Sequence, residues 1–281
     1  MAELKRAYDS KVAAGELTAD PAQHSAIEAL DRIGAAFANR KEPKGLGGFF
    51  AKKPEPVPGL YLWGGVGRGK SMLMDLFHDT LGSPKTRRVH FHSFMQEVQS
   101  ALHEARKTGV DDAIRPVADD MSDGLTLLCL DEMQITDIAD AMIVGRLFER
   151  MMDAGVTVVT TSNRHPDDLY KDGLNRALFL PFIELLKTRM AVHELVSPRD
   201  YRQDRLKGAD TYFSPADGAA STAIEAIWQD LTGGAGTPLT LTVKSRKIEL
   251  PGFFAGVGRA RFYDLCGQPL GPADYLAIAE A

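Results

Sequence analysis

The stretch that decides the fold is LYLWGGVGRGKSMLM, residues 60–74. A short apolar run ends in a cluster of glycines, which is followed by a lysine, a serine and a new amphipathic pattern. From Gly64 to Ser71 the spacing matches G-x-x-x-x-G-K-[ST], in which backbone N–H groups surround a phosphate chain. Glycine suits this task because a side chain would keep the backbone away from the anion. The segment therefore predicts a phosphate-binding loop between a strand and a helix.

The spacing also assigns roles within this loop. Lys70 is expected to reach the β- and γ-phosphates as a point charge, and the Ser71 hydroxyl is expected to ligate Mg²⁺. The N-terminus of the following helix points at the same anion and favours its charge. The residues predicted to contact the nucleotide are Gly64, Gly65, Val66, Gly67, Arg68, Gly69, Lys70, Ser71 and Met72. A glycine-rich turn that contains Lys-Ser by chance is the alternative, and the strand and helix that flank the loop speak against it.

An acidic pair follows a second apolar run in LTLLCLDEMQ, residues 125–134. Apolar residues without alternation predict a strand buried on both faces, which runs directly into Asp131 and Glu132. At the carboxyl end of a parallel strand, Asp131 is expected to hold Mg²⁺ together with Ser71. Glu132 is expected to polarise an attacking water, which favours hydrolysis over transfer to a metabolite. The alternative is an acidic strand end that only caps a turn.

A third strand ends in polar residues in VTVVTTSNR, residues 156–164. An amide at this place can position the lytic water and respond to the γ-phosphate, so Asn163 joins Lys70 and Glu132 as a candidate catalytic residue. An ordinary strand-to-turn asparagine before HPDD is the alternative.

Short apolar runs alternate with helical patterns from residue 59 onwards. This alternation predicts a parallel five-stranded sheet covered by helices on both faces. The expected strands are 59–63, 87–94, 125–130, 156–162 and 189–195, and the expected helices are 70–81, 94–107, 137–153 and 175–187. Residues 1–40 are expected to be helical, and a Pro-, Gly- and Lys-rich linker follows them. His90 and His92 are expected to share one face of the second strand without forming a metal site.

The regular alternation of strand and helix patterns ends after residue 198, where we expect a smaller α+β region. Residues 221–234 predict a helix capped by Ser221 and ended by Gly233. The other expected elements are a hairpin over 238–251, a short strand over 259–266 and a helix over 273–281. The predicted domains are residues 1–58, 59–198 and 199–281.

The bulk composition narrows the class of protein. The two cysteines, Cys129 and Cys266, lie far apart, which argues against a disulfide framework and suits a reducing compartment. The net charge of −5 gives no basic excess for nucleic acid. We expect no membrane span and no targeting segment, since no apolar run approaches the ~18 residues that a bilayer requires.

Three longer blocks resemble one family. GLYLWGGVGRGKSMLMDLF, LDEMQITDIADAMIVGRLFE and TSNRHPDDLYKDGLNRALFLPFIELLK are similar to the ZapE / AFG-like family of AAA+ P-loop ATPases. The likeness runs from about residue 5 to the end. It implies an α/β P-loop NTPase fold of the AAA+ type, ATP and Mg²⁺ as cofactors, and ATP hydrolysis at the interfaces of a homo-oligomeric ring or partial ring. Bacterial members act in cell division and mitochondrial members in inner-membrane protein quality control.

The resemblance also implies an arginine that reaches the site from a neighbouring subunit. Arg176 in GLNRALF is the preferred candidate and Arg164 the second, while a surface arginine or an internal ion pair is the alternative for Arg176. The implied partner in bacteria is the division-ring GTPase polymer, and the implied location is the cytoplasm, with a peripheral place at the inner membrane as an option. A nucleotide-gated binding module with little turnover and a helicase-loader-like ATPase on DNA are the competing functions.

The chain departs from the family pattern at LGPADYLAIAEA, where no counterpart of a second-sensor arginine follows. An incomplete lid over the nucleotide is therefore expected, together with weak or slow ATP turnover.

Overall fold

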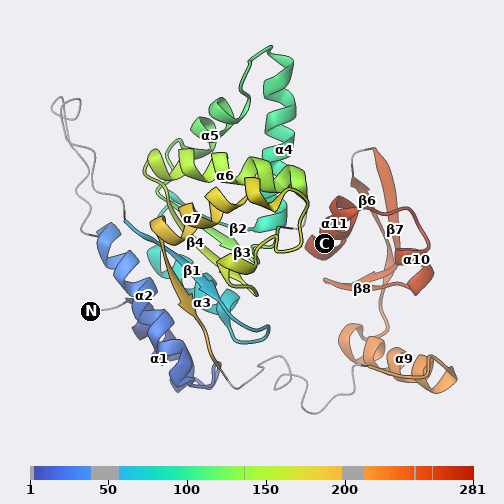
Figure 1. Ribbon diagram of the computed structural model, residues 1–281. Coiled ribbons are helices and arrows are strands. Elements are labelled where there is room, and N and C mark those ends of the chain that lie inside the picture. Colours follow the sequence, from blue (N-terminus) through green and yellow to red (C-terminus); the bar gives the residue numbers. More distant parts are fainter. Residues whose placement is uncertain (1–2, 39–56, 136, 198–211, 244, 255) are drawn as a thin grey trace. The chain divides into compact units, whose positions relative to one another are not determined.

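The protein forms two compact units in a computed structural model, Met1–Arg205 and Leu206–Ala281 (Figure 1). The structure describes residues 3–38, 57–135, 137–197, 212–243, 245–254 and 256–281. The helices predicted as a separate N-terminal segment lie within the first unit. The predicted boundary at residue 198 falls among residues 198–211, outside the described residues.

A five-stranded parallel sheet forms the centre of the first unit, as predicted. Its strands are β1 (Gly59–Trp63), β2 (Thr86–His90), β3 (Leu127–Asp131), β4 (Thr157–Ser162) and β5 (Met190–Glu194). They lie in the order β2-β3-β4-β1-β5, and all neighbouring pairs are parallel. The carboxyl ends of parallel strands meet at one edge of a sheet. The loops that follow β1, β3 and β4 therefore gather at the same place, although they are far apart in the sequence.

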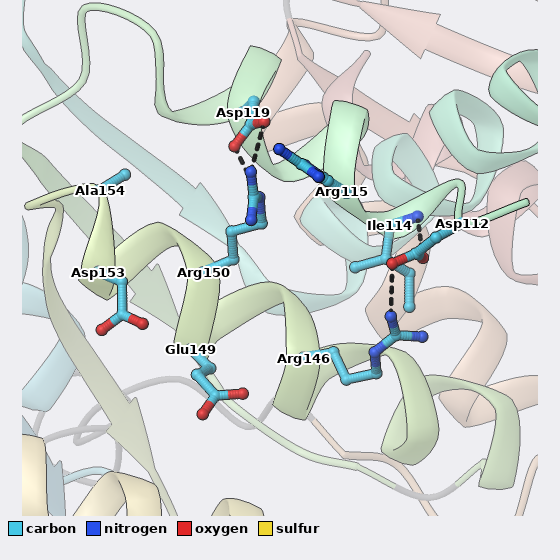
Figure 2. Close-up of a pocket in the computed structure, with 9 residues that line it drawn as sticks. All are labelled: Asp112, Ile114, Arg115, Asp119, Arg146, Glu149, Arg150, Asp153 and Ala154. Carbon is cyan, nitrogen blue, oxygen red and sulfur yellow. Dashed lines mark hydrogen bonds and ion pairs between the residues drawn. The ribbon is translucent and has the colours of Figure 1, made fainter. Parts of the chain in front are cut away.

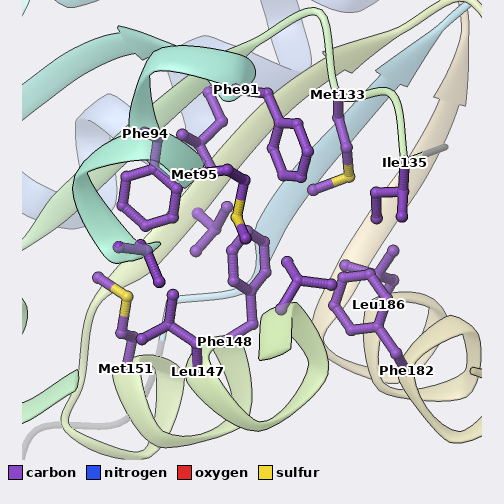
Figure 3. Packing of buried hydrophobic residues seen from close by; sticks show 14 of the residues in the cluster. Phe91, Phe94, Met95, Met133, Ile135, Leu147, Phe148, Met151, Phe182 and Leu186 are labelled. Carbon is purple, nitrogen blue, oxygen red and sulfur yellow. The ribbon is translucent and has the colours of Figure 1, made fainter. Parts of the chain in front are cut away.

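Helices cover both faces of this sheet. They are α1 (Glu3–Ala13), α2 (Pro21–Ala38), α3 (Lys70–Leu81), α4 (Phe91–Lys107), α5 (Ile114–Ser122), α6 (Ile138–Asp153) and α7 (Leu180–Arg189). One apolar cluster lies between the sheet and α4–α7, where the rings of Phe94, Phe148 and Phe182 meet edge to face (Figure 3). A second cluster joins α1, α2 and α3 to the other face. None of the helices in the described residues has the length and apolar character needed to cross a membrane.

Strand β3 contributes side chains to both clusters. Leu128 and Leu130 pack in the first, and Leu127 and Cys129 in the second, because successive side chains of a strand point to opposite faces. This explains its unbroken apolar pattern. Burial raises the pKa of the Cys129 thiol to about 12, which fits a small residue of the apolar core.

Several predictions of secondary structure in this unit were wrong. The strand predicted over 87–94 ends at His90, and α4 begins at Phe91 because Phe91, Phe94 and Met95 are buried at helical spacing. His90 and His92 therefore do not share a strand face. Helix α5 was not predicted. The helix predicted over 175–187 begins at Leu180, after a single 3₁₀ turn at Arg176–Leu178.

The second unit combines helices with a small antiparallel sheet. Its elements are α9 (Gly218–Thr232), β6 (Thr237–Val243), β7 (Arg246–Phe254), β8 (Val257–Arg259), α10 (Phe262–Cys266) and α11 (Pro272–Glu280). The sheet order is β6-β7-β8, so the predicted hairpin is confirmed. Gly233 ends α9 with φ 63° as predicted, but the N-cap is Asp217, whose carboxylate accepts from two backbone N–H groups, and not Ser221. The strand predicted over 259–266 was wrong, because Phe262–Cys266 are helical.

A test of the sheet packing is available at Gly59, the first residue of β1. A Cβ at this position would collide with the backbone carbonyl of Val158 in β4. We expect Gly59→Ala to lower the free energy of unfolding by about 1–3 kcal/mol, because two paired strands would have to separate. Urea unfolding measures this, with Gly34→Ala in α2 as the matched control. At Gly34 the added methyl meets only side chains, at 3.6 Å. If Gly34→Ala lowers the free energy of unfolding as much as Gly59→Ala does, the close packing of β1 on β4 at Gly59 is contradicted.

Candidate active site

Lys70 lies at the centre of the predicted phosphate-binding loop. It is the first residue of α3, and only 7% of it is exposed. Its Nζ donates to the carbonyl oxygens of Gly64 and Gly65, each at 2.8 Å, and to Oδ1 of Asn163 at 2.9 Å. The structure thus brings together a lysine and an asparagine that are 93 residues apart in the sequence. Both were predicted to act on the γ-phosphate.

Two glycines of the loop are required by their surroundings. Gly64 has φ 150°, and a Cβ there would lie 2.6 Å from the Leu195 carbonyl oxygen. Gly69 has φ 89°, and a Cβ there would lie 2.5 Å from Nε2 of Gln23. The loop can therefore keep this path only without side chains at the two positions, which agrees with a backbone that approaches a phosphate chain.

Asp131 lies at the carboxyl end of β3 and is 1% exposed. Its Oδ1 accepts from the Ser71 hydroxyl at 2.9 Å and from the Thr161 hydroxyl at 2.5 Å. Mg²⁺ takes oxygen ligands, so the paired Ser71 and Asp131 supply donor atoms that fit the ion. Magnesium binding itself stays a prediction. When bound there, Mg²⁺ would neutralise charge on the β- and γ-phosphates.

Arg88 completes this carboxylate site and was not predicted. From β2 its Nη2 donates to Oδ2 of Asp131 at 2.8 Å, and its Nε donates to Oδ1 of Asp75 in α3 at 2.7 Å. His90 Nδ1 lies 3.7 Å from the same Asp131 oxygen. Burying a carboxylate is costly unless such partners form hydrogen bonds with it. The one available signal in the sequence was a pair of arginines inside a strand pattern.

Glu132 differs sharply from its neighbour Asp131. It has φ 57°, a left-handed conformation that is unusual for a residue other than glycine, and its side chain is exposed. The Thr161 hydroxyl accepts from the Glu132 N–H at 2.9 Å, and the Thr161 carbonyl accepts from the Met133 N–H at 2.8 Å. These bonds hold the turn, in which the Asp131 carboxylate is buried beside the loop and the Glu132 carboxylate is exposed. The catalytic role of Glu132 stays a prediction.

The two candidate finger arginines, Arg176 and Arg164, both follow β4 in the sequence. Arg176 donates from Nη2 to the Asp167 carbonyl oxygen at 2.5 Å, and its buried Nε has no partner among the described residues. Arg164 is exposed, and its carbonyl oxygen accepts from the Tyr61 hydroxyl at 3.0 Å. Neither contact completes the site within one chain, and action from a neighbouring copy stays a prediction.

A charged hollow between α5 and α6 offers no competing site (Figure 2). Its main charges neutralise one another, since Arg150 makes two hydrogen bonds to Asp119 at 2.7 Å and Arg146 pairs with Asp112 at 2.6 Å. Such exposed pairs are typical of a solvated surface.

The parallel sheet, the phosphate-binding loop and the polar groups at the ends of β3 and β4 define a P-loop nucleotide-binding fold of the AAA+ type. The family model described as AFG1-like ATPase matches residues 2–281. The chain belongs to this family.

Individual relatives agree with this assignment. The chain is 39% identical over 242 residues to Lactation elevated protein 1 homolog B of Danio rerio, covering 82% of this chain and 48% of the relative. It is 35% identical over 252 residues to the cell division protein ZapE of Escherichia coli K12, covering 89% and 64% respectively. The chain therefore spans about half to two thirds of these relatives. The crystal structure of DnaI is similar at 18% identity with a TM-score of 0.44, over 64% of this chain and 88% of DnaI.

Proposed function

We propose that this chain binds ATP with Mg²⁺ and hydrolyses it to ADP and phosphate. The observation that carries the proposal is the convergence of Lys70, Asn163, Ser71 and Asp131 on one edge of the sheet. These residues come from the ends of three strands and supply the charge, amide and oxygen ligands that a triphosphate with its metal requires.

Each side chain then has a defined task. Lys70 exchanges its carbonyl acceptors for phosphate oxygens, because hydrogen bonds between charged groups are the stronger ones. Asn163 is released by this exchange and can orient the attacking water. Glu132 accepts a proton from that water while the water oxygen bonds to the γ-phosphorus. The bond from the γ-phosphorus to the bridging oxygen breaks, and ADP leaves with the electron pair.

We propose that the working form is a homo-oligomer in which Arg176 acts on the site of the next copy. The surface around Arg176 supports this, since Leu174, Leu178 and Leu180 are exposed close to it in sequence. Exposed apolar groups beside a cation are typical of a surface that another protein covers.

We propose that hydrolysis regulates or remodels a protein partner of the bacterial division apparatus, such as the division-ring GTPase polymer. The relative named as a cell division protein supports this choice. The place of action would be the cytoplasm, with peripheral contact to the inner membrane. Co-sedimentation with the purified polymer should then differ between ATP and ADP, and equal binding in both states would contradict the coupling.

The nucleotide site itself is tested by Lys70→Ala. We expect the affinity for a fluorescent ATP analogue to fall about 10- to 100-fold, because several charge-assisted hydrogen bonds to phosphate are lost. Fluorescence titration measures this, and thermal unfolding separates it from loss of fold. Lys107→Ala in α4 removes an exposed lysine and should leave the affinity unchanged. Unchanged affinity in Lys70→Ala would place the nucleotide elsewhere.

A further inference from the structure

A buried amide connects the N-terminal helices to the phosphate-binding loop. Gln23 lies in α2 and is 1% exposed, although its side chain is polar. Its Nε2 donates to the carbonyl oxygen of Arg68 at 3.0 Å, across 45 residues of sequence. Its Oε1 accepts from the Tyr8 hydroxyl of α1 at 2.8 Å. Both ends of the amide are thus engaged, one with the loop and one with the other helix.

The direction of these hydrogen bonds is fixed by a third one. The Tyr8 oxygen accepts from the backbone N–H of Asp20 at 3.1 Å, so its own proton is left for Gln23. Burial raises the pKa of the Tyr8 hydroxyl, which therefore stays protonated at neutral pH. A hydroxyl that donates to Gln23 turns the amide oxygen toward itself and the NH₂ toward the loop.

The carbonyl that Gln23 holds belongs to the Arg68–Gly69 peptide. In a planar trans peptide the C=O and the following N–H point in opposite directions. Because Gln23 draws the Arg68 oxygen toward α2, the Gly69 N–H must point away from α2. We propose that Gln23 is a positioning residue of the nucleotide site, which fixes this peptide so that the Gly69 N–H can donate to the phosphate chain.

Gly69 shows how closely Gln23 approaches this peptide. Its φ of 89° is readily adopted by glycine, and a Cβ at this position would lie 2.5 Å from Nε2 of Gln23. The same helical pair is tied together elsewhere, since the Asp31 carboxylate of α2 accepts from the N–H groups of Leu4 and Lys5 at 3.1 and 3.2 Å. Tyr8 and Gln23 therefore belong to two helices that are bound to each other, and Gln23 contacts the loop from this pair.

The inference rests on the proposed nucleotide site and adds a specific dependence. A peptide that faces the phosphate chain should matter for ATP and for ADP, because both carry the inner phosphates. It should matter little for the proton transfer to Glu132. Gln23 should therefore affect nucleotide affinity and the KM for ATP, and leave kcat nearly unchanged.

Gln23→Glu tests this with almost no change in shape. When it is ionised, the new carboxylate faces the Arg68 carbonyl with an oxygen that cannot donate, so the peptide loses its anchor. We expect the affinities for fluorescent ATP and ADP analogues to fall about tenfold each, and kcat to change less than about twofold. Tyr8→Phe removes the hydroxyl that orients the amide, together with its bond from the Asp20 N–H, and leaves Gln23 itself in place; we expect a loss of about threefold in both affinities.

Asp31→Ala is the matched control, because it loosens the same helical pair without contact to the loop. If Asp31→Ala weakens nucleotide binding as much as Gln23→Glu, the effect is general loosening and the inference is wrong. Unchanged affinity in folded Gln23→Glu overturns it as well. Should Gln23→Glu not fold, unchanged affinity in Tyr8→Phe has the same meaning. A wild-type chain that binds neither analogue would instead contradict the proposed function.

Discussion

Replacing Glu132 by glutamine is expected to lower the rate of ATP hydrolysis by on the order of 10²–10⁴-fold, the usual contribution of a positioned general base. The amide keeps the size of the carboxylate but cannot accept the proton of the attacking water. ATP affinity should stay within about twofold of wild type, because the loop, Lys70 and Asp131 are untouched. Steady-state phosphate release measures the first effect, and titration with a fluorescent ATP analogue measures the second.

Glu149→Gln supplies a control for the loss of one exposed carboxylate. Glu149 lines the hollow between α5 and α6, away from the nucleotide site, and its substitution should not change turnover. Undiminished phosphate release in Glu132→Gln would show that another group activates the water. Loss of ATP binding in the same variant would show that Glu132 has a structural task, which its exposed side chain does not indicate.

The parts of the site that the sequence predicts are those that local geometry determines. The G-x-x-x-x-G-K-S spacing positions Lys70 and Ser71 within a few residues of the end of β1. Asp131 and Asn163 follow directly after apolar strands. Parallel strands end at the same edge of a sheet. Identifying the strands was therefore enough to predict that the residues at their ends lie close together.

The contacts that the sequence does not predict are those that depend on which elements become neighbours. Arg88 reaches Asp131 across 43 residues because β2 pairs with β3 in register, and Gln23 reaches the loop because α2 packs beside α3. Thr161 was visible only as part of a polar strand end, although it accepts from Glu132 and donates to Asp131. The hydrophobic periodicity of a single segment carries no information on which other segment it will contact. The boundary at Phe91 was missed for a similar reason, since burial in the core outweighed an apparent strand pattern.

One short segment joins the predicted γ-phosphate contact to the candidate finger. Asn163 accepts from Lys70, and the carbonyl that holds Arg176 belongs to Asp167, only a few residues further along the chain. Between them, the Arg164 carbonyl is tied to Tyr61 of β1. The γ-phosphate contact and the acceptor of Arg176 therefore lie on one short segment, whose backbone is anchored to β1 between them. This arrangement suits an arginine that must be released toward a neighbouring copy.

Arg176→Ala is accordingly expected to lower ATP turnover by on the order of 10³–10⁵-fold, the range found for arginines that stabilise charge in phosphoryl transfer. ATP affinity should be largely retained, because within its own chain Arg176 donates to the Asp167 carbonyl and not to the phosphate-binding loop. Arg164→Ala should have a much smaller effect. The reverse order of the two losses would make Arg164 the finger, and equal, small losses would contradict a finger in this segment.

Mixing two inactive variants shows whether Arg176 acts between copies. Glu132→Gln retains the arginine but lacks the base, whereas Arg176→Ala retains the base but lacks the arginine. In a mixed assembly, Arg176 of the first variant can complete the site of the second, so phosphate release should reappear when the two are combined. Light scattering with ATP and Mg²⁺ establishes whether the copies assemble under these conditions. Because an arginine that serves its own chain cannot be supplied by another, assembly without recovered turnover would contradict the shared site.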